Sequence, residues 1–379
     1  MTGRAAIAGS IGRLVGGLGA ERPVALPPQE DVDRPGVSFV VPVHNGERWL
    51  DEVLSAILAQ DDGRPMEVVA VDDRSVDGSP GILRAYAARG RVRVIDGQGD
   101  GAAAALNRGI RHATHRIICQ VDQDVILRPG WMARLTAELS QPDRGAAQGR
   151  YLRPGAGTVW VRVMALDLEH RYGRIRGRDV DHVCTGNSAF RADALHKVGL
   201  FDERLGYGYD NDMSYRLGAA GYRLAFCHEA TSEHRWPEGA TAYLAQQYGF
   251  GYGRLDLIAK HRGRLTGDQV SGLGMILHAP LMLLVLATVG ATILLRLAGG
   301  PWVPAAVVAS GLLMLLAFER LAAGLRAAVR FRDPAGLWFA PIHLLRDVAW
   351  AMALAVWLVR RLAGRPSQPS DSMPRRESP

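Results

Sequence analysis

Short apolar runs alternate with amphipathic segments between residue 37 and about residue 235. The runs that predict strands are VSFVVPV (37–43), MEVVAVDD (66–73), VRVID (92–96) and RIICQVD (116–122). Such short, continuously apolar runs are typical of strands buried on both faces of a sheet. Segments with helical spacing lie between them, at 47–60, 80–90 and 102–113. This alternation predicts an α/β fold in which a mostly parallel sheet carries helices on both faces.

Two long uncharged stretches follow residue 240. Residues 269–295 and 297–318 contain no Asp, Glu, Lys or Arg, and a helix needs about 20 apolar residues to cross a bilayer. Buried helices of a soluble domain are the alternative, but two uncharged stretches of this length argue against it. We therefore expect two transmembrane spans, at about 274–295 and 301–318.

A third apolar stretch, residues 335–359, is interrupted by Arg346 and Asp347. Because charges are rare inside a bilayer, it is either a third span or an interfacial helix followed by a short buried one. Arginines gather at 320–332 and after residue 359. If 335–359 does not cross, the positive-inside rule places both clusters in the cytoplasm. We expect a protein of the inner or plasma membrane whose α/β domain is cytoplasmic.

Composition agrees with a soluble domain joined to a smaller membrane region. Hydrophobic residues make up 48% of the chain, and the formal net charge is +7. An excess of Arg and Lys suits phosphate-bearing substrates, anionic lipid or nucleic acid. The arginines crowd beside apolar stretches and no nucleic-acid-binding motif accompanies them, so membrane lipid is the expected partner. The expected regions are a flexible arm (1–36), the α/β domain (37–265), a membrane region (269–360) and a disordered basic tail (361–379).

Polar residues follow the first two predicted strands, where ligands bind in sheets of this kind. The first strand ends at Pro42 and Val43, followed closely by Asn45, and the backbone there could approach a nucleotide. The second ends at Asp72 and Asp73, whose carboxylates can accept hydrogen bonds from a base N–H or from ribose hydroxyls. A polar turn is the alternative, because Asp, Ser and Gly are ordinary turn residues.

The fourth predicted strand runs into the sequence VDQD, which places Asp122 and Asp124 two positions apart. Alternation along a strand would point both carboxylates to the same side. A cation between them would relieve their repulsion, and oxygen ligands suit Mg²⁺ or Mn²⁺, which can also hold a diphosphate. The alternative is a solvated acidic turn, since isolated Asp-x-Asp pairs are common.

Two later segments carry further titratable side chains. GYGYDNDMSYRL (206–217) places Asp210 and Asp212 at a predicted helix start. One of these carboxylates can cap the helix, and Asp210 can act as a general base for a hydroxyl group. FCHEATSEHRW (226–236) contributes His234, although an isolated histidine is more often structural than a ligand.

The ordered set of motifs resembles glycosyltransferase family 2, the inverting enzymes of the GT-A fold, from Val37 to His261. The matching segments are VVPVHN, VDDRSVDGS, ALNRG (105–109), VDQD, GNSAF (186–190), YDNDMSYRL and EH (233–234). Each motif is weak alone, and the ordered set is specific. The resemblance implies a GT-A domain with a Rossmann-like sheet, followed by C-terminal transmembrane helices. It is similar to membrane-anchored bacterial enzymes of exopolysaccharide or cell-envelope synthesis.

The resemblance implies a role for each matching residue. A nucleotide-sugar, commonly a UDP-sugar, would be bound by Pro42, Val43, Asn45, Asp72, Asp73, Asn107 and Asp122. Mg²⁺ or Mn²⁺ on the diphosphate would be held by Asp124 and His234. Asp210 matches the catalytic base, and the region of the donor or acceptor sugar would contain Gly186, Asn187 and Asp212.

Two departures from the family pattern bear on activity. The family usually has Glu-Asp at the base motif, whereas Tyr209 precedes Asp210 here, with Asp212 a weaker substitute for the base. Processive polysaccharide synthases carry Gln-x-x-Arg-Trp after the base. The nearest sequence here, QQYGF (246–250), lacks the Arg-Trp pair. We therefore expect a non-processive enzyme that adds one sugar at a time.

Together these features predict an inverting, metal-dependent glycosyltransferase that acts on a hydroxyl group of a glycan or lipid-linked acceptor. A loop over residues 240–255 is expected to close over the donor. The alternative is a catalytically inactive nucleotide-sugar-binding scaffold in the membrane, which the altered Glu-Asp motif supports. A sugar-1-phosphate nucleotidyltransferase would need a Gly-rich loop with Arg and Lys near its N-terminus, and the sequence at 44–46 is not such a loop.

Overall fold

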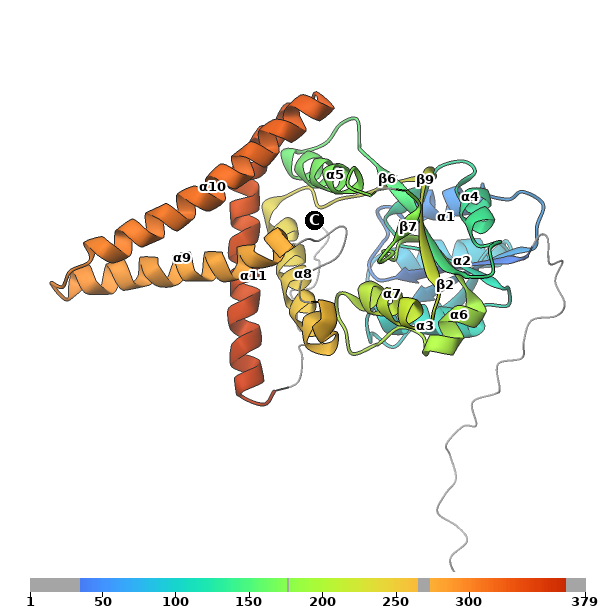
Figure 1. The fold of residues 1–379 in the computed structure, drawn as a ribbon. Helices are drawn as coiled ribbons and strands as arrows, with labels where there is room; N and C mark the ends of the chain where they lie inside the picture. Colours follow the sequence, from blue (N-terminus) through green and yellow to red (C-terminus); the bar gives the residue numbers. More distant parts are fainter. Residues whose placement is uncertain (1–34, 176, 265–272, 366–379) are drawn as a thin grey trace, which may run out of the picture.

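A mixed sheet and a group of long apolar helices are the two parts of the chain (Figure 1). The computed structural model describes residues 35–175, 177–264 and 273–365. The expected arm over 1–36 and tail over 361–379 lie almost wholly outside these residues. Within them, nine strands form one sheet, and helices cover both of its faces.

Four parallel strands form the half of the sheet that the sequence predicts. Their order across the sheet is β3 (Arg93–Asp96), β2 (Met66–Asp72), β1 (Val37–Val43) and β4 (Ile117–Val121). Successive side chains of β1 point to opposite faces. Phe39 and Val41 pack on the face covered by α1 (Leu50–Leu58) and α2 (Ser79–Ala88), and Val40 packs on the face covered by α3 (Ala102–His112). Burial on both faces explains the continuous apolar runs.

The other half of the sheet is mixed. Beyond β4 come β8 (Asn187–Arg191), β6 (Arg144–Leu152), β9 (Arg223–His234) and β5 (Val125–Leu127), and β7 (Asp179–Val180) pairs with β9. The helices α4 (Trp131–Glu138), α6 (Ala192–Val198) and α7 (Tyr209–Ala219) accompany these strands. The chain builds outwards from β1 to β3 and then returns to β4 on the other side of β1. The strand order therefore reverses between β1 and β4, where open α/β sheets bind ligands.

Three helices in the described part of the chain are long and apolar enough to cross a membrane, judged by length and composition. These segments are Gly274–Leu297, Val303–Phe331 and Pro334–Leu362, and they correspond to α9 (Leu273–Leu297), α10 (Val303–Phe331) and α11 (Phe339–Leu362). In Figure 1, α9 and α10 form a long hairpin and α11 crosses both. Large apolar side chains on these helices are exposed, as on Leu294 (69%) and Phe318 (72%), which suits a lipid environment.

The charges that interrupt the third apolar stretch are paired. Arg320 of α10 donates to the two carboxylate oxygens of Asp347 at 3.0 and 3.1 Å. Arg346 donates to Asp167 of α5 (Val159–Tyr172) at 3.2 Å. Because charges inside an apolar segment are costly unless they are paired, these contacts allow α11 to continue unbroken through both residues. The second pair also ties α11 to the α/β domain.

Helix α8 (Ala240–Lys260) joins the two parts and corrects one expectation. Residues 240–255, expected to form a loop, belong to this 21-residue helix. Glycines are weak helix formers, but here they permit close packing on both sides. A Cβ atom at Gly251 would lie 3.0 Å from Trp350 of α11, and one at Gly253 would lie 2.5 Å from Tyr207 of the α/β domain.

Candidate active site

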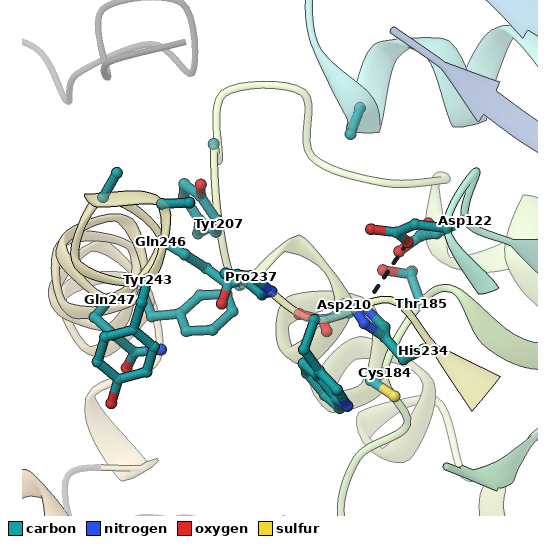
Figure 2. Close-up of a pocket in the computed structure, with 18 of the residues that line it drawn as sticks. Asp122, Cys184, Thr185, Tyr207, Asp210, His234, Pro237, Tyr243, Gln246 and Gln247 are labelled. Carbon is teal, nitrogen blue, oxygen red and sulfur yellow. Dashed lines mark ion pairs between the residues drawn. The ribbon is translucent and has the colours of Figure 1, made fainter. Parts of the chain in front are cut away.

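A cavity of about 1990 Å³ begins at the carboxyl ends of β1, β2 and β4 and extends between α5 and α8 as far as α9 and α11. Figure 2 shows part of it, with Asp210 and His234 on one side and Gln246 and Gln247 of α8 on the other. The predicted site residues that line it are Pro42, Val43, Asn45, Asp73, Asp122, Asp124, Asp210 and His234. The fold thus brings eight predicted residues from distant parts of the sequence to one cavity.

The turn after β1 forms one wall of the cavity. Asn45 has a left-handed φ of 53°, a conformation that Asn tolerates better than most residues. Its backbone N–H donates to Ser75 Oγ at 3.0 Å, and its Oδ1 accepts from the N–H of Val76 at 2.8 Å. These bonds join the turns that follow β1 and β2, and they fix the position of Pro42 and Val43 on the cavity wall.

Asp73 lines the cavity, whereas Asp72 supports the turn beside it. The Asp73 side chain is buried and accepts from the N–H groups of Gly99 (2.8 Å) and Gly101 (2.9 Å). Asp72 Oδ1 accepts from the N–H of Ser75 at 3.0 Å. Because a carboxylate can accept about four hydrogen bonds, Asp73 can hold the glycine loop and still bind a ligand.

Asp124 and His234 face each other where β5 meets the end of β9. His234 Nε2 lies 3.8 Å from Asp124 Oδ1, and the ion pair is dashed in Figure 2. The imidazole stacks on Trp236, with ring centroids 4.0 Å apart, and meets Tyr151 edge-on at 5.2 Å. The two aromatic rings therefore orient the imidazole towards Asp124.

Gly186 allows the chain to pass close to Asp122. Its φ is +88°, and a Cβ atom there would lie 2.4 Å from Asp122 Oδ2. Gln120 donates to the other carboxylate oxygen, Asp122 Oδ1, at 2.7 Å. Asn187 is fully buried and accepts from Trp131 Nε1 at 2.6 Å. Gly186 and Asn187 do not line the cavity. They belong to the segment that packs behind Asp122.

Asp210 lies in the first turn of α7 and lines the cavity. Its carboxylate accepts from the N–H of Asn211 at 2.8 Å and from the backbone of Thr185. Burial raises the pKa of Asp210 above its ordinary value, although the nearby His182 opposes the shift. A carboxylate with a raised pKa takes a proton from a hydroxyl group more readily. Tyr209 stays a neutral phenol, because burial raises its pKa, and it bonds to Thr185.

Asp212 and Asn107 do not line the cavity, and their side chains bond to protein. Asp212 is fully buried and contacts Lys260 Nζ at 2.5 Å and His261 Nε2 at 2.7 Å. Asn107 both donates to and accepts from the backbone of Phe201 at 2.9 Å. Asp212 therefore joins α7 to the end of α8, and Asn107 joins α3 to the segment before α7.

Several aromatic and amide residues that line the cavity were missed in the sequence. Trp236 follows His234 by two positions, and Tyr207 precedes Asp210 by three. Their closeness to motif residues was the available signal. Tyr151 on β6 carries no local signal, because only the fold brings it to the cavity. Gln246 lies in the stretch at 240–255 that was expected to close over the donor, but no role was predicted for it.

Asp124 and His234 fit two of the ligands of a divalent cation. Their oxygen and nitrogen atoms are 3.8 Å apart, and each can lie about 2.1 Å from a shared ion. No group of three or more His, Cys, Asp or Glu side chains that could hold a metal occurs within residues 35–175, 177–264 and 273–365. The remaining ligands would then be substrate oxygens and water, the usual arrangement for Mg²⁺.

Comparison with known proteins gives consistent results. Residues 38–199 match the family model described as glycosyl transferase family 2. The chain is 32% identical over 193 residues to an uncharacterized glycosyltransferase of Mycobacterium bovis, which covers 50% of this chain and 81% of that protein. It is 26% identical over 362 residues to the pre-mycofactocin glycosyltransferase of Mycobacterium tuberculosis, covering 91% of this chain and 70% of that protein.

The structure is similar to that of the mannosyltransferase PcManGT from Pyrobaculum calidifontis, solved in complex with GDP-Man and Mn²⁺. The TM-score is 0.56 at 22% sequence identity, and the match covers 89% of this chain and 91% of the other. At this identity the likeness shows that the two chains share a fold.

Proposed function

Because this chain belongs to glycosyltransferase family 2 and has the GT-A fold, we propose that its cavity catalyses metal-dependent transfer of a sugar, with inversion, from a nucleotide-sugar to a hydroxyl group. One observation carries the proposal: Asp73, the Asp124–His234 pair and Asp210 line one continuous cavity at the point where the strand order reverses. These groups supply donor recognition, a place for the cation and a proton acceptor.

The nucleotide binds at the end of the cavity formed by the turns after β1 and β2. Asp73 and the loop at 97–101 offer a carboxylate and a glycine-rich backbone there, and Asn45 fixes the facing wall. A UDP-sugar is the first donor to test, since uridine is common in the family. A GDP-sugar is the second, since PcManGT was solved with GDP-Man.

Asp124 and His234 would hold the cation, with Asp122 beside them. Mg²⁺ or Mn²⁺ suits a carboxylate and an imidazole as ligands. When bound, the ion supplies positive charge that stabilises the departing diphosphate. The contribution of the chain is to orient the imidazole, through the rings of Trp236 and Tyr151, before the donor arrives.

Asp210 acts as the general base. The acceptor oxygen forms a bond to the anomeric carbon while that carbon loses its bond to the diphosphate oxygen. The hydroxyl proton moves to Asp210, and the nucleoside diphosphate leaves with the electron pair. Attack from the face opposite the leaving group inverts the anomeric configuration. A positioned base of this kind contributes about 10²–10⁴-fold to the rate. Tyr209 bonds to Thr185, and Asp210 lines the cavity.

The three apolar helices anchor the enzyme in the membrane, with the α/β domain on the cytoplasmic side, where nucleotide-sugars are made. Anchoring confines the search for a membrane-borne acceptor to two dimensions and raises its effective concentration. The arginines at 320–332, where α10 returns towards the side of the α/β domain, support this orientation. The missing Arg-Trp pair supports transfer of one sugar at a time, in exopolysaccharide or cell-envelope synthesis.

The test is donor binding and turnover by the full chain in detergent, with UDP-, GDP- and dTDP-sugars and Mn²⁺ or Mg²⁺. Asp124→Asn should lose metal-dependent donor binding. Asp210→Asn should bind the donor and lose turnover by about 10²–10⁴-fold. Asp193→Asn, at an exposed carboxylate of α6 outside the cavity, is the control and should behave as wild type. A wild-type chain that binds a donor but never turns it over would favour the scaffold alternative.

A further inference from the structure

The cavity does not stop at Asp210 but continues to the apolar helices. Its far end is lined by Met275, Ile276, Ala279 and Pro280 of α9 and by Leu354 of α11. Both helices are candidate membrane spans. An occupant of this end therefore touches residues that belong to the membrane region, while its other end can reach the proposed base.

Four of the buried polar side chains that line the same cavity, all on α8 or α11, have incomplete hydrogen bonding. Gln246 of α8 is 6% exposed, and His343, Arg346 and Trp350 of α11 are 2%, 4% and 8% exposed. Each has one polar atom without a hydrogen-bond partner among the described residues: Gln246 Oε1, His343 Nδ1, Arg346 Nε and Trp350 Nε1. Arg346 Nε lies 3.7 Å from Asp347 Oδ1, which is too far for a hydrogen bond.

Buried polar groups in folded proteins are almost always hydrogen-bonded. Four incomplete ones in the wall of one cavity therefore indicate a ligand that completes them. Arg346 and Trp350 offer N–H donors, and the Arg346 guanidinium lies over the Trp350 ring, 4.6 Å from its centroid. Two oriented donors on one helix, next to a third nitrogen at His343, suit a ligand rich in acceptor oxygens.

The charge at this end of the cavity favours an anion. Within the described parts of α5, α8, α9 and α11, the charged residues that line it are Arg171, Arg254, Arg346 and Asp167. Arg171 and Arg346 both pair with Asp167, each at 3.2 Å, so one carboxylate is shared by two guanidinium groups. The excess is positive, and guanidinium groups bind phosphate particularly well.

We propose that His343, Arg346 and Trp350 form an acceptor subsite that binds the phosphate of a lipid-borne acceptor, whose apolar chain lies against α9 and α11, and that Gln246 Oε1 accepts a hydrogen bond from a hydroxyl of the group attached to that phosphate. The proposal rests on the proposed function, because it identifies the acceptor for the same cavity. The phosphate is held at the subsite, and the sugar or other hydroxyl-bearing group attached to it extends towards Asp210. The reaction step is the sugar transfer described above.

The test measures binding of a polyprenyl phosphate to the full chain in phosphatidylcholine nanodiscs, without donor or metal. The same polyprenol without phosphate and inorganic phosphate without a lipid chain are the comparison ligands. Polyprenyl phosphate should bind at least about tenfold more tightly than either, because a hydrogen bond to a charged group and the apolar chain each add affinity. Equal binding of the polyprenol would show a site for the apolar chain alone, and equal binding of inorganic phosphate would show an anion site without a lipid. Either result would overturn the proposal.

Two conservative variants locate the binding. Trp350→Phe keeps an aromatic ring and removes the Nε1 donor, and Arg346→Lys keeps the charge beside Asp167 and removes the planar donor group. Each should weaken polyprenyl phosphate binding about tenfold, whereas Trp302→Phe, at the hairpin between α9 and α10, should leave it unchanged. Wild-type affinity in both subsite variants would overturn the assignment. Donor binding with Mn²⁺ is recorded for every variant and should not change. If the wild-type chain binds polyprenyl phosphate but binds no nucleotide-sugar donor, that result would instead count against the proposed function.

Discussion

Tyr207 fits against a glycine face of α8, and a Cβ atom at Gly253 would lie 2.5 Å from Tyr207 Cβ. Tyr207 also meets Phe250 edge-on, with centroids 5.4 Å apart. The loop that contains Tyr207 leads directly into α7 and the proposed base, Asp210. Because the other side of α8 packs on α11 at Gly251, one helix connects the position of Asp210 to a helix that is long and apolar enough to cross a membrane.

Replacement of Gly253 by Ala should therefore displace the base. The added methyl group also approaches Tyr207 O to 2.7 Å, and backbone cannot move as freely as a flexible side chain. We expect a loss of stability of about 1–3 kcal/mol and a fall in kcat of up to about 10²-fold, as for misplacement of a catalytic group by about 1 Å. Thermal unfolding and donor turnover measure the two effects.

The control for this variant is Gly218→Ala. Gly218 lies in α7, and a Cβ atom there would have no neighbour within 4 Å. Alanine stabilises a helix interior by about 0.5–1 kcal/mol relative to glycine, so this variant should be active and slightly more stable. Wild-type kcat in Gly253→Ala would mean that the contact with Tyr207 does not position the base.

The rate of transfer should depend on pH through Asp210. Burial raises the pKa of this carboxyl group from its ordinary value of 3.8, and only the ionised form accepts a proton. The kcat should therefore rise with pH through the raised pKa, and the acidic limb should lie above pH 3.8. A pH profile of kcat with saturating donor and acceptor measures it. The residual activity of Asp210→Asn should not show this rise of kcat with pH. If the variant retains the rise, another group is responsible for it.

Asp210 and Asp212 should have opposite effects on stability. The folded state raises the pKa of Asp210, so ionisation of Asp210 costs stability as pH rises above 3.8, and Asp210→Asn should raise Tm at pH 7. Although burial opposes it, Lys260, His261 and Arg216 lower the pKa of Asp212. Its stabilisation is therefore present above pH 3.8 and lost as pH falls.

Asp212→Asn should accordingly lower stability, by about 1–3 kcal/mol at pH 7, because it weakens the hydrogen bonds of a buried carboxylate to the partly exposed Arg216, Lys260 and His261. Thermal unfolding of both variants at pH 7 and at pH 4 checks the signs. A fall in Tm for Asp210→Asn together with a rise for Asp212→Asn would reverse the roles that we assign to the two carboxylates.

The sequence predicted the parallel half of the sheet and the long apolar helices because their patterns are local. The run at 37–43 coincides with β1, since a strand buried on both faces is apolar throughout. The mixed half was not predicted, because its strands are defined by pairing with strands far along the chain, as β6 pairs with β9. The motifs located Asp124 and Asp210 at the cavity. The motifs could not distinguish Asp124 and Asp210 from Asp212, because a sequence does not show whether an aspartate contacts a ligand or another side chain such as Lys260.

The variant Gly186→Ala tests whether the segment behind Asp122 contributes to donor binding. Alanine at this position would adopt an unfavourable φ of +88°, and its Cβ would lie 2.4 Å from Asp122 Oδ2. Strain of this kind costs about 1–2 kcal/mol, and relief of the contact would move the Asp122 carboxylate. Gly186→Ala should therefore weaken donor binding in Mn²⁺ at least about tenfold, measured by calorimetry.

Gly199→Ala separates strain from displacement. Gly199 has a similar φ of +90°, but a Cβ atom there would have no neighbour within 4 Å, and the residue lies outside the cavity. The two variants should lose similar stability, because the backbone strain is the same, while only Gly186→Ala should lose donor affinity. If both variants bind the donor equally well, the approach of Gly186 to Asp122 serves folding alone, and Asp122 has no part in holding the donor.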